Sequence, residues 1–239
     1  MHTMPHTGPW ADLIVYPESD GKPMADNTWQ ARWIITLYNN LRSCFDPAEV
    51  FIAADLLWYP EEGKISVSFA PDVMVVFGRP DGDRPSWMPW REEGLNPQVV
   101  FEVLSPSNSQ VEMMRKLQAY ELYGVEELIV IDPGRHPGDA EHFASWVREG
   151  NSLKAQETGR EAWTSPRLGV RFSYEGDRIV VEDRSGSRFR TFESLKSQLD
   201  AEKQRAEAEQ RKAEAEKQRA DEAHAELERL RARLRELES

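Results

Sequence analysis

A carboxylate interrupts an apolar stretch of the chain, because Glu102 lies within residues 99–104, whose other members are Val, Phe and Leu. A near-continuous apolar run of this length is typical of a strand at the centre of a sheet. Carboxylates are almost never fully buried unless they are paired or bound to a metal. Glu102 therefore needs a partner, which is either an Arg or Lys from a neighbouring helix or a bound cation.

A second carboxylate stands at the start of another apolar run. Asp72 follows Pro71 and precedes residues 73–77, which read Val-Met-Val-Val-Phe. Two carboxylates on adjacent strands can bind Mg²⁺, which prefers oxygen ligands, keeps several waters and meets substrate phosphates. Asp72 and Glu102 together therefore predict a site for Mg²⁺ (or Mn²⁺), with the ion pair as the alternative for Glu102.

The elements that must position these acids follow the order helix, strand, strand, strand, helix, strand. Apolar side chains at helical spacing predict a first helix that begins at Asn27 or Thr28 and ends near Cys44. Ser109 and Glu112 form a capping box that opens the second helix. Strands are expected at 51–58, at 65–77 with a bend at Pro71, at 98–104 and at 127–131.

The remaining sequence adds hairpins and a charged tail to this core. Turn residues at 149–151 and 175–177 predict hairpins within residues 142–183. The fold class is mixed α/β (α+β). We expect three regions: an N-terminal segment at 1–24, a domain at 25–185 with its core at about 25–135 and a β-rich extension at 140–185, and a coiled coil at 191–239.

The tail repeats every seven residues. One register places mostly apolar residues at the a and d positions, namely Phe192, Leu195, Leu199, Ala206, Ala213, Ala220, Ala223, Leu227, Leu230, Leu234 and Leu237. Three glutamates, Glu202, Glu209 and Glu216, interrupt the d positions. The pattern predicts a coiled coil through which the chain forms a homo-oligomer. A solitary helix supported by i,i+4 charge pairs is the alternative.

The charge of the chain limits the kind of partner it can have. The net charge is −12, and residues 191–239 hold 11 Lys/Arg and 13 Asp/Glu, so about −10 belongs to the rest of the chain. This balance argues against a protein that coats nucleic acid by bulk electrostatics. It does not exclude a small acidic site that meets a phosphate through a metal.

Cysteine usage and hydropathy bear on the compartment. Cys44 is the one cysteine, so no intramolecular disulfide can form, and a reducing compartment such as the cytoplasm is expected. Residues Met1–Leu13 contain no apolar core typical of a signal peptide. No run approaches the roughly 18 apolar residues of a membrane span, so no membrane partner is expected.

These residues carry a resemblance to a known family. The order of elements, with Pro71-Asp72 and then Glu102, resembles the PD-(D/E)xK nuclease superfamily. The longer pattern is similar to the Uma-two-type family of restriction endonucleases over about residues 25–135. It comprises Glu102-Val-Leu-Ser-Pro-Ser-Asn108, then Glu112, Lys116, Tyr120, Gly124-Val-Glu-Glu127 and Ile131-Asp-Pro133.

The resemblance implies a restriction-endonuclease-like core, a DNA substrate and a catalytic role for Asp72, Glu102 and Lys116. Asp72, Glu102 and the backbone carbonyl of Val103 would ligate the metal. The superfamily usually places a Lys two residues after the Glu, where this chain has Leu104. The family pattern instead puts the Lys on the following helix, and Lys116 matches it. The function implied is a divalent-metal-dependent endonuclease.

Structural roles stand beside each of these assignments. Glu112 is accounted for by its capping box, and Lys116 could pair with it at i,i+4. Tyr120 shares the helical face of Lys116 and could position it, contact phosphate or simply pack in the core. Asp55 could be a third acid near the metal, although a turn or a solvated position accounts for it as well.

Two further features leave the function open. The family pattern has a His near the start of the first helix, where this chain has Trp29 and Gln30. The loop at 78–97 mixes Arg and Trp with acids, so it either contacts nucleic acid or packs against the domain. The alternative function is a catalytically inactive binding or assembly module that works through its coiled coil.

Overall fold

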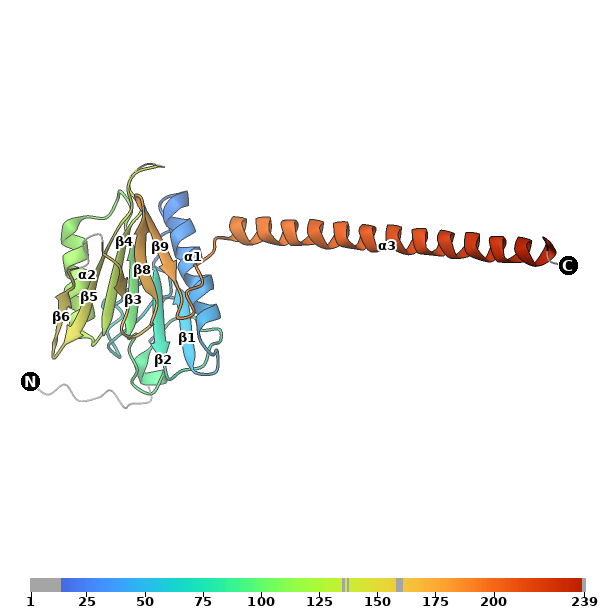
Figure 1. Cartoon of the computed structure of the whole chain (residues 1–239). Helices are drawn as coiled ribbons and strands as arrows, with labels where there is room; N and C mark the ends of the chain where they lie inside the picture. Colours follow the sequence, from blue (N-terminus) through green and yellow to red (C-terminus); the bar gives the residue numbers. More distant parts are fainter. Residues whose placement is uncertain (1–13, 135, 137, 158–160, 238–239) are drawn as a thin grey trace, which may run out of the picture. The chain divides into compact units, whose positions relative to one another are not determined.

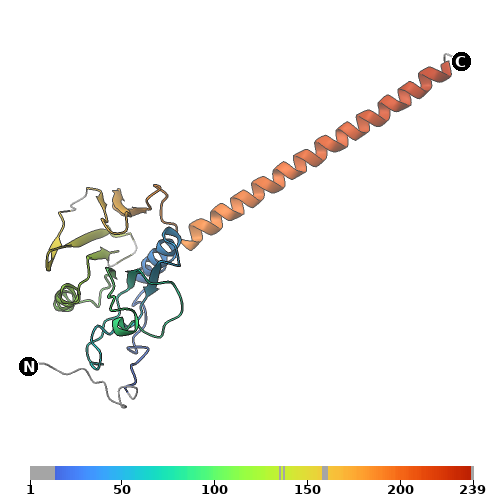
Figure 2. The same ribbon diagram turned by 90° about the horizontal axis from the view of Figure 1, so that it is seen from below.

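The chain divides into two compact units, Met1–Phe189 and Arg190–Ser239 (Figures 1 and 2). The computed structural model describes residues 14–134, 136, 138–157 and 161–237, without the side chains of 236 and 237. The expectations for Met1–Leu13 and for the side chain of Leu237 therefore lie outside the described residues. Each unit is described separately below.

A six-stranded mixed sheet forms the centre of the first unit, with the strands in the order β1-β2-β3-β4-β5-β6 (Figure 1). Neighbouring strands are antiparallel except β3 and β4, which are parallel and are joined by a helix. The strands are β1 (Val50–Ala54), β2 (Val73–Phe77), β3 (Val99–Val103), β4 (Glu127–Asp132), β5 (His142–Glu149) and β6 (Ser152–Ala155). The predicted order of helix, strand, strand, strand, helix, strand is confirmed.

Two helices cover opposite faces of this sheet. Helix α1 (Thr28–Cys44) contributes Ile34, Leu37 and Leu41 to a core that includes the odd-numbered hydrophobic residues of β2, β3 and β4. Helix α2 (Gln110–Leu122) contributes Tyr120 to a second core that includes the even-numbered residues of the same strands. Because side chains alternate along a strand, Phe101 faces α1, whereas Glu102 faces α2.

Both helices begin where the sequence predicts. The side chain of Asn27 accepts a hydrogen bond from the backbone N–H of Gln30, and Ser109 accepts one from Glu112. These contacts satisfy amide groups that have no partner inside the helix. The helix starts matter for function, because Asn27 and Ser109 stand close in sequence to residues that line the site described below.

A second, three-stranded sheet packs against the α1 side of the domain. Its strands are β7 (Trp163–Thr164), β8 (Arg171–Glu175) and β9 (Arg178–Glu182), in that order. Phe172 of β8 and Val181 of β9 belong to the same core cluster as α1. The predicted hairpins are confirmed, since β5 pairs with β6 and β8 pairs with β9.

Two predicted strands are shorter than expected. Strand β1 ends at Ala54, because Asp55 adopts a left-handed backbone with φ 49°. Residues 65–72 form no strand ahead of β2, and Phe69 makes only an isolated bridge to Trp58. The alternating pattern of 65–69 was therefore a wrong indication, since alternation without a continuous partner strand forms no ladder.

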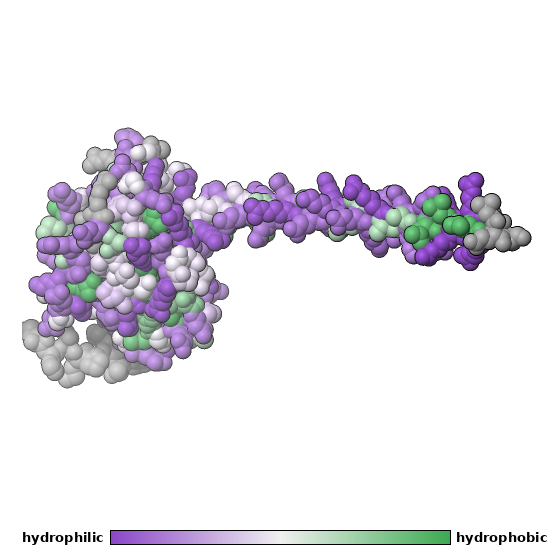
Figure 3. All heavy atoms as spheres, viewed as in Figure 1, coloured by the Kyte–Doolittle hydropathy of each residue, from purple (hydrophilic) through white to green (hydrophobic). Residues whose placement is uncertain are grey.

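The second unit is a single helix, α3 (Phe192–Leu237), of 46 residues. Its hydrophobic side chains are exposed, and they include Phe192, Leu195, Leu199, Leu227, Leu230 and Leu234. Figure 3 shows a mostly hydrophilic helix with hydrophobic residues gathered near its C-terminal end. The helix is confirmed, whereas its association into a coiled coil stays a prediction. No helix among the described residues combines the length and apolar character that a membrane crossing requires.

Candidate active site

Glu102 is held by two side chains of α2. Its carboxylate is buried, with 3% of the residue exposed. One oxygen, Oε2, accepts a hydrogen bond of 2.7 Å from Nζ of Lys116, and Oε1 accepts one from the hydroxyl of Tyr120. Lys116 and Tyr120 stand one helical turn apart, so both reach the same residue of β3. This is the ion pair that the sequence offered as one partner for Glu102.

The protonation of these two partners follows from their surroundings. Burial lowers the pKa of Lys116, but the charge of Glu102 and the hydrogen bond to it outweigh burial and leave that pKa above its usual value. Burial, then the negative charge of Glu102, raises the pKa of Tyr120 well above its usual value. Lys116 is therefore a cation and Tyr120 a neutral hydrogen-bond donor. The ring of Tyr120 also packs against Trp58 and Phe69, which fixes its position.

Asp72 lies next to Glu102 on the adjacent strand, just before the start of β2. Val73 pairs with Phe101 at the end of the β2–β3 ladder, so Asp72 opposes Glu102 one position further along. Its Oδ2 accepts a hydrogen bond of 2.6 Å from the backbone N–H of Val103. Burial, followed by the charge of Glu102, raises the pKa of Asp72 to about 8. Two carboxylates thus share a space that contains one ammonium group.

The carbonyl of Val103 is held from the other face of the sheet. Gln30, on the buried side of α1 with 6% exposed, donates from Nε2 to this oxygen at 2.9 Å. Helix α1 therefore reaches the end of β3 through Gln30, in the region where the sequence analysis expects a His. A polar residue on the same helical face as Ile34 and Leu37 is the signal that could have identified it.

The start of α1 is tied to the loop that follows β3. Asp26 accepts hydrogen bonds from the hydroxyls of Ser105 and Ser107, and its backbone N–H donates to Oε1 of Gln30 at 2.8 Å. The two serine hydrogen bonds are the largest influence on Asp26, and they lower its pKa. Sequence reasoning did not assign Asp26 a role, because its partners lie about 80 residues away in the chain. Together Asp26 and Gln30 connect the serine loop to the Val103 carbonyl.

A cleft of about 530 Å³ is lined by Asp26, Gln30, Asp72, Ser107 and Lys116, and Glu102 lies behind Lys116 and is not part of its lining. Asp55 and Glu112 also line it. Asp55 is exposed, yet partial desolvation, followed by the charge of Asp20, raises its pKa. Asp55 therefore lies in the same cleft as the other acids, although its suggested place among the metal ligands stays a prediction.

The predicted alternative for Lys116 is not the arrangement found. Its ammonium pairs with Glu102 rather than with Glu112, whose negative charge acts on it only at longer range. Glu112 contributes its backbone N–H to the cap at Ser109. Lys116 is thus directed into the cleft by a partner on the sheet and not by its own helix.

The donor set can be compared with what Mg²⁺ requires. Within the part of the chain that the structure describes, no three His, Cys, Asp or Glu side chains are grouped to hold a metal. Mg²⁺ is commonly bound by one or two carboxylates, with waters and substrate phosphates completing its ligands. Asp72 has one oxygen without a protein donor among the described residues, and the Val103 carbonyl has a second lone pair. The donors present therefore fit a hard divalent cation.

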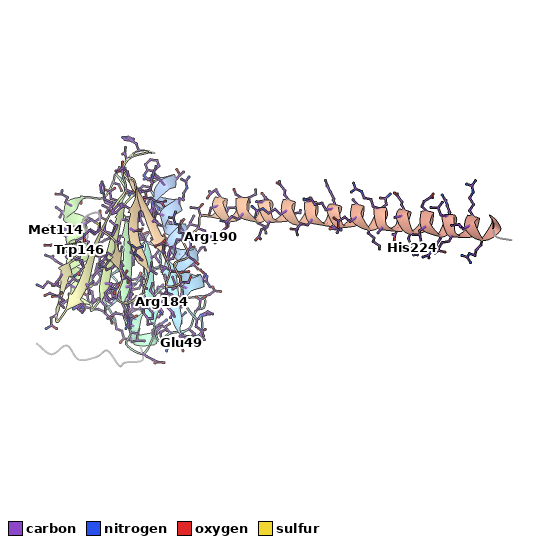
Figure 4. The ribbon with its side chains drawn as sticks, viewed as in Figure 1. Glu49, Met114, Trp146, Arg184, Arg190 and His224 are labelled. Carbon is purple, nitrogen blue, oxygen red and sulfur yellow. The ribbon has the colours of Figure 1, made fainter. Side chains whose placement is uncertain are left out.

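Two other features of the domain carry less chemistry. In the loop at 78–97, Arg79 and Arg84 both pair with Glu92, and Trp87 is completely buried, so the loop packs against the domain. A mainly apolar hollow of about 420 Å³ lies between α2 and the sheet, where Met114 and Trp146 are neighbours (Figure 4). It holds none of the three predicted catalytic residues.

Comparison with known families bears on this site. The Uma2 family, described as "Putative restriction endonuclease", matches residues 18–140, which is just over half of the chain. The chain belongs to the Uma2 family. The matched residues include both acids, Lys116 and Tyr120, as well as Gln30 and Asp26, so the whole cleft lies inside the Uma2 domain.

Other comparisons add little about function. No curated protein matches the chain. A crystal structure described as "a putative nuclease belonging to DUF820 from Anabaena variabilis ATCC 29413" is similar at 14% sequence identity and a TM-score of 0.46. The match covers 66% of this chain and 87% of the other.

The raised pKa of Asp72 predicts how stability depends on pH in the metal-free protein. The folded state favours the neutral carboxyl, so stability falls as the pH rises from the usual value of 3.8 toward about 8. Asp72→Asn removes this loss and should melt at a higher temperature than wild type at pH 8 in EDTA, with a smaller difference at pH 5. Tryptophan fluorescence can follow the domain, because every Trp precedes Arg190. Asp83→Asn, on an exposed loop, is the control, and an equal difference at both pH values would contradict the prediction.

The contact between Gln30 and Val103 predicts a large effect of a conservative change. Gln30→Leu keeps the size of the side chain but leaves the carbonyl without its helix donor. We expect the free energy of unfolding to fall by about 1–3 kcal/mol, the usual cost of an unsatisfied buried polar group. Gln118→Leu, on the exposed face of α2, should change it by less than about 0.5 kcal/mol. Urea titrations followed by tryptophan fluorescence test this, and equal losses would exclude a special role for Gln30.

Proposed function

We propose that this protein is a divalent-metal-dependent endonuclease that hydrolyses DNA phosphodiester bonds. The observation that carries the proposal is the closeness of Asp72 and Glu102 on adjacent strands, with Lys116 bound to Glu102 and lining the same cleft as Asp72. Membership of a family described as restriction endonucleases supports DNA as the substrate. Mg²⁺ or Mn²⁺ is the cofactor that this set of oxygen donors fits.

In this proposal, Asp72, Glu102 and the Val103 carbonyl hold the cation. When bound, the cation would polarise the scissile phosphate and lower the pKa of an attacking water. Tyr120 donates to Glu102 and fixes the orientation of its carboxylate. Gln30 holds the Val103 carbonyl from behind, as outer-shell partners do for metal ligands.

Lys116 has the electrostatic role. Its ammonium is positively charged and mostly buried, so its field is screened less than that of a surface lysine. It can hydrogen-bond a water or a phosphate oxygen beside Glu102 and offset negative charge that develops on the phosphate. Because Lys116 is fixed by Glu102 before substrate arrives, little reorganisation is needed during reaction.

The second candidate is a binding or assembly module that has lost cleavage and works through α3. The observation in its favour is the negative charge of the domain, which opposes DNA in the absence of a cation. The presence of Asp72, Glu102 and Lys116 together favours the enzyme. In either case we propose that α3 forms the contacts of a homo-oligomer.

Cleavage should depend on the cation and on the acids that hold it. With Mn²⁺ or Mg²⁺, wild type should cut a mixture of duplex and single-stranded DNA, and EDTA should stop it. Asp72→Ala should abolish cleavage and Mn²⁺ binding measured by calorimetry, whereas Asp83→Ala on an exposed loop should preserve both. Lys116→Ala should lower kcat by roughly 100-fold or more while Mn²⁺ binding persists.

Three results would count against this proposal. Wild type that cuts no DNA under these conditions favours the inactive module. Mn²⁺ binding that survives in both Asp72→Ala and Glu102→Ala removes the metal site. Loss of folded structure in Lys116→Ala, seen by circular dichroism, assigns Lys116 a purely structural role.

Association should depend on the last heptads of α3. Leu227, Leu230 and Leu234 offer burial at a and d, whereas Ala and Glu occupy most of the central positions. Light scattering should show a dimer or larger species for the full chain and a smaller species for a chain that ends at Arg190. Leu230→Glu should also dissociate the full chain, and Ala225→Glu, away from the predicted seam, should not. Monomers throughout, at tens of micromolar, would leave α3 as a solitary helix.

A further inference from the structure

One wall of the cleft is built by a segment without helix or strand, residues 16–26, which we call the N-terminal strap. Its first end is anchored at Tyr16, whose ring packs edge-to-face on Tyr59 at 5.0 Å and tilts against Trp90. The Tyr16 hydroxyl accepts a hydrogen bond from Gly63, and the Tyr59 hydroxyl donates to the carbonyl of Pro17. The strap is thus fastened to the domain before it reaches the cleft.

The other end of the strap is fastened at Asp26, which accepts hydrogen bonds from Ser105 and Ser107 of the loop after β3. Between the anchors, Asp20 and Lys22 line the cleft, and the backbone N–H of Lys22 donates to the Asp20 side chain at 2.9 Å. A chain fixed at both ends and folded back on itself between them has few conformations. The position of Lys22 in the lining of the cleft therefore follows from the fold.

The cleft is lined by more acidic than basic side chains. Five carboxylates line it, from Asp20, Asp26, Asp55, Asp72 and Glu112, against two ammonium groups, from Lys22 and Lys116. Lys116 is committed to Glu102. The ammonium of Lys22 makes no hydrogen bond or close ion pair with any residue that the structure describes; its charge acts on Asp26 only at longer range, and the residue is exposed. An entering phosphodiester, repelled by the acids, would meet Lys22 as the uncommitted cation.

We propose that Lys22 binds a phosphate of the substrate strand and that the N-terminal strap is the substrate-contacting wall of the cleft. The inference rests on the proposed function, because it takes the ligand to be a nucleic acid strand. Lys22 contributes to substrate binding, and the hydrolysis itself depends on Asp72, Glu102 and Lys116. A lysine contacts phosphate as a point charge without reading sequence, so this contact is independent of the bases.

The test compares cleavage kinetics of a single-stranded oligonucleotide with Mn²⁺ in three variants of the full chain. Lys22→Ala should raise KM by roughly tenfold or more, as expected for loss of a charge-assisted contact, and should leave kcat within about twofold. Lys22→Arg should stay close to wild type. Lys154→Ala removes an exposed lysine of β6 that does not line the cleft, and it should change neither constant.

Salt dependence gives a second measurement. Each phosphate contact to a single strand contributes about −0.7 to the slope of log K against log salt concentration. Lys22→Ala should therefore reduce the steepness of log(kcat/KM) against log salt by about that amount, with Mn²⁺ affinity and thermal stability unchanged. A KM and a slope equal to those of Lys154→Ala would overturn the proposal.

Failure of the proposed function can be separated from failure of this inference. If wild type cuts no nucleic acid, the endonuclease assignment fails, and fluorescence anisotropy of the same oligonucleotide with Mn²⁺ then tests Lys22 alone. Weaker binding in Lys22→Ala than in Lys154→Ala would support the contact. Equal binding, or none in wild type, would overturn it.

Discussion

The burial of one carboxylate in the middle of a sheet is the constraint around which the domain is arranged. Glu102 is compatible with its position because α2 brings Lys116 and Tyr120 to its two oxygens. That requirement sets the rotation of α2 about its axis, since both partners must point at β3. The contacts that compensate the charge of Glu102 also hold α2 against β3, so the electrostatics of the site and the packing of the helix depend on each other.

The two faces of the sheet support the site in different ways. The α2 face carries the charged groups of the site, and on the α1 face the buried Gln30 reaches the backbone at the end of β3. Each side of β3 is therefore held by a helix, one through a side chain and one through a carbonyl. An end of a strand that is supported from both faces can keep oxygen donors in fixed positions, as metal sites require.

Much of this arrangement could be predicted from the sequence, because it rests on local patterns. Glu102 was conspicuous within an apolar strand, the caps at Asn27 and Ser109 are short-range, and the heptads identify α3. The contact of Gln30 with Val103 could not be predicted, since it joins residues 73 positions apart through a backbone atom that has no sequence signature. The strand predicted at residues 65–69 is absent because their alternating pattern is local, whereas a strand also needs a continuous partner strand elsewhere in the chain.

The alternation of side chains along β3 also limits where residues can be inserted into or deleted from the protein chain. Successive side chains of a strand point to opposite faces of the sheet. If Val100 were removed and α2 kept its place, each remaining side chain of β3 on one side of the deletion would turn to the opposite face. Glu102 would then enter the apolar core beside Ile34, and Phe101 would meet the ammonium of Lys116. Insertions and deletions should therefore be absent from this strand and be confined to loops such as 150–151 and 176–177, where a change of length alters no face.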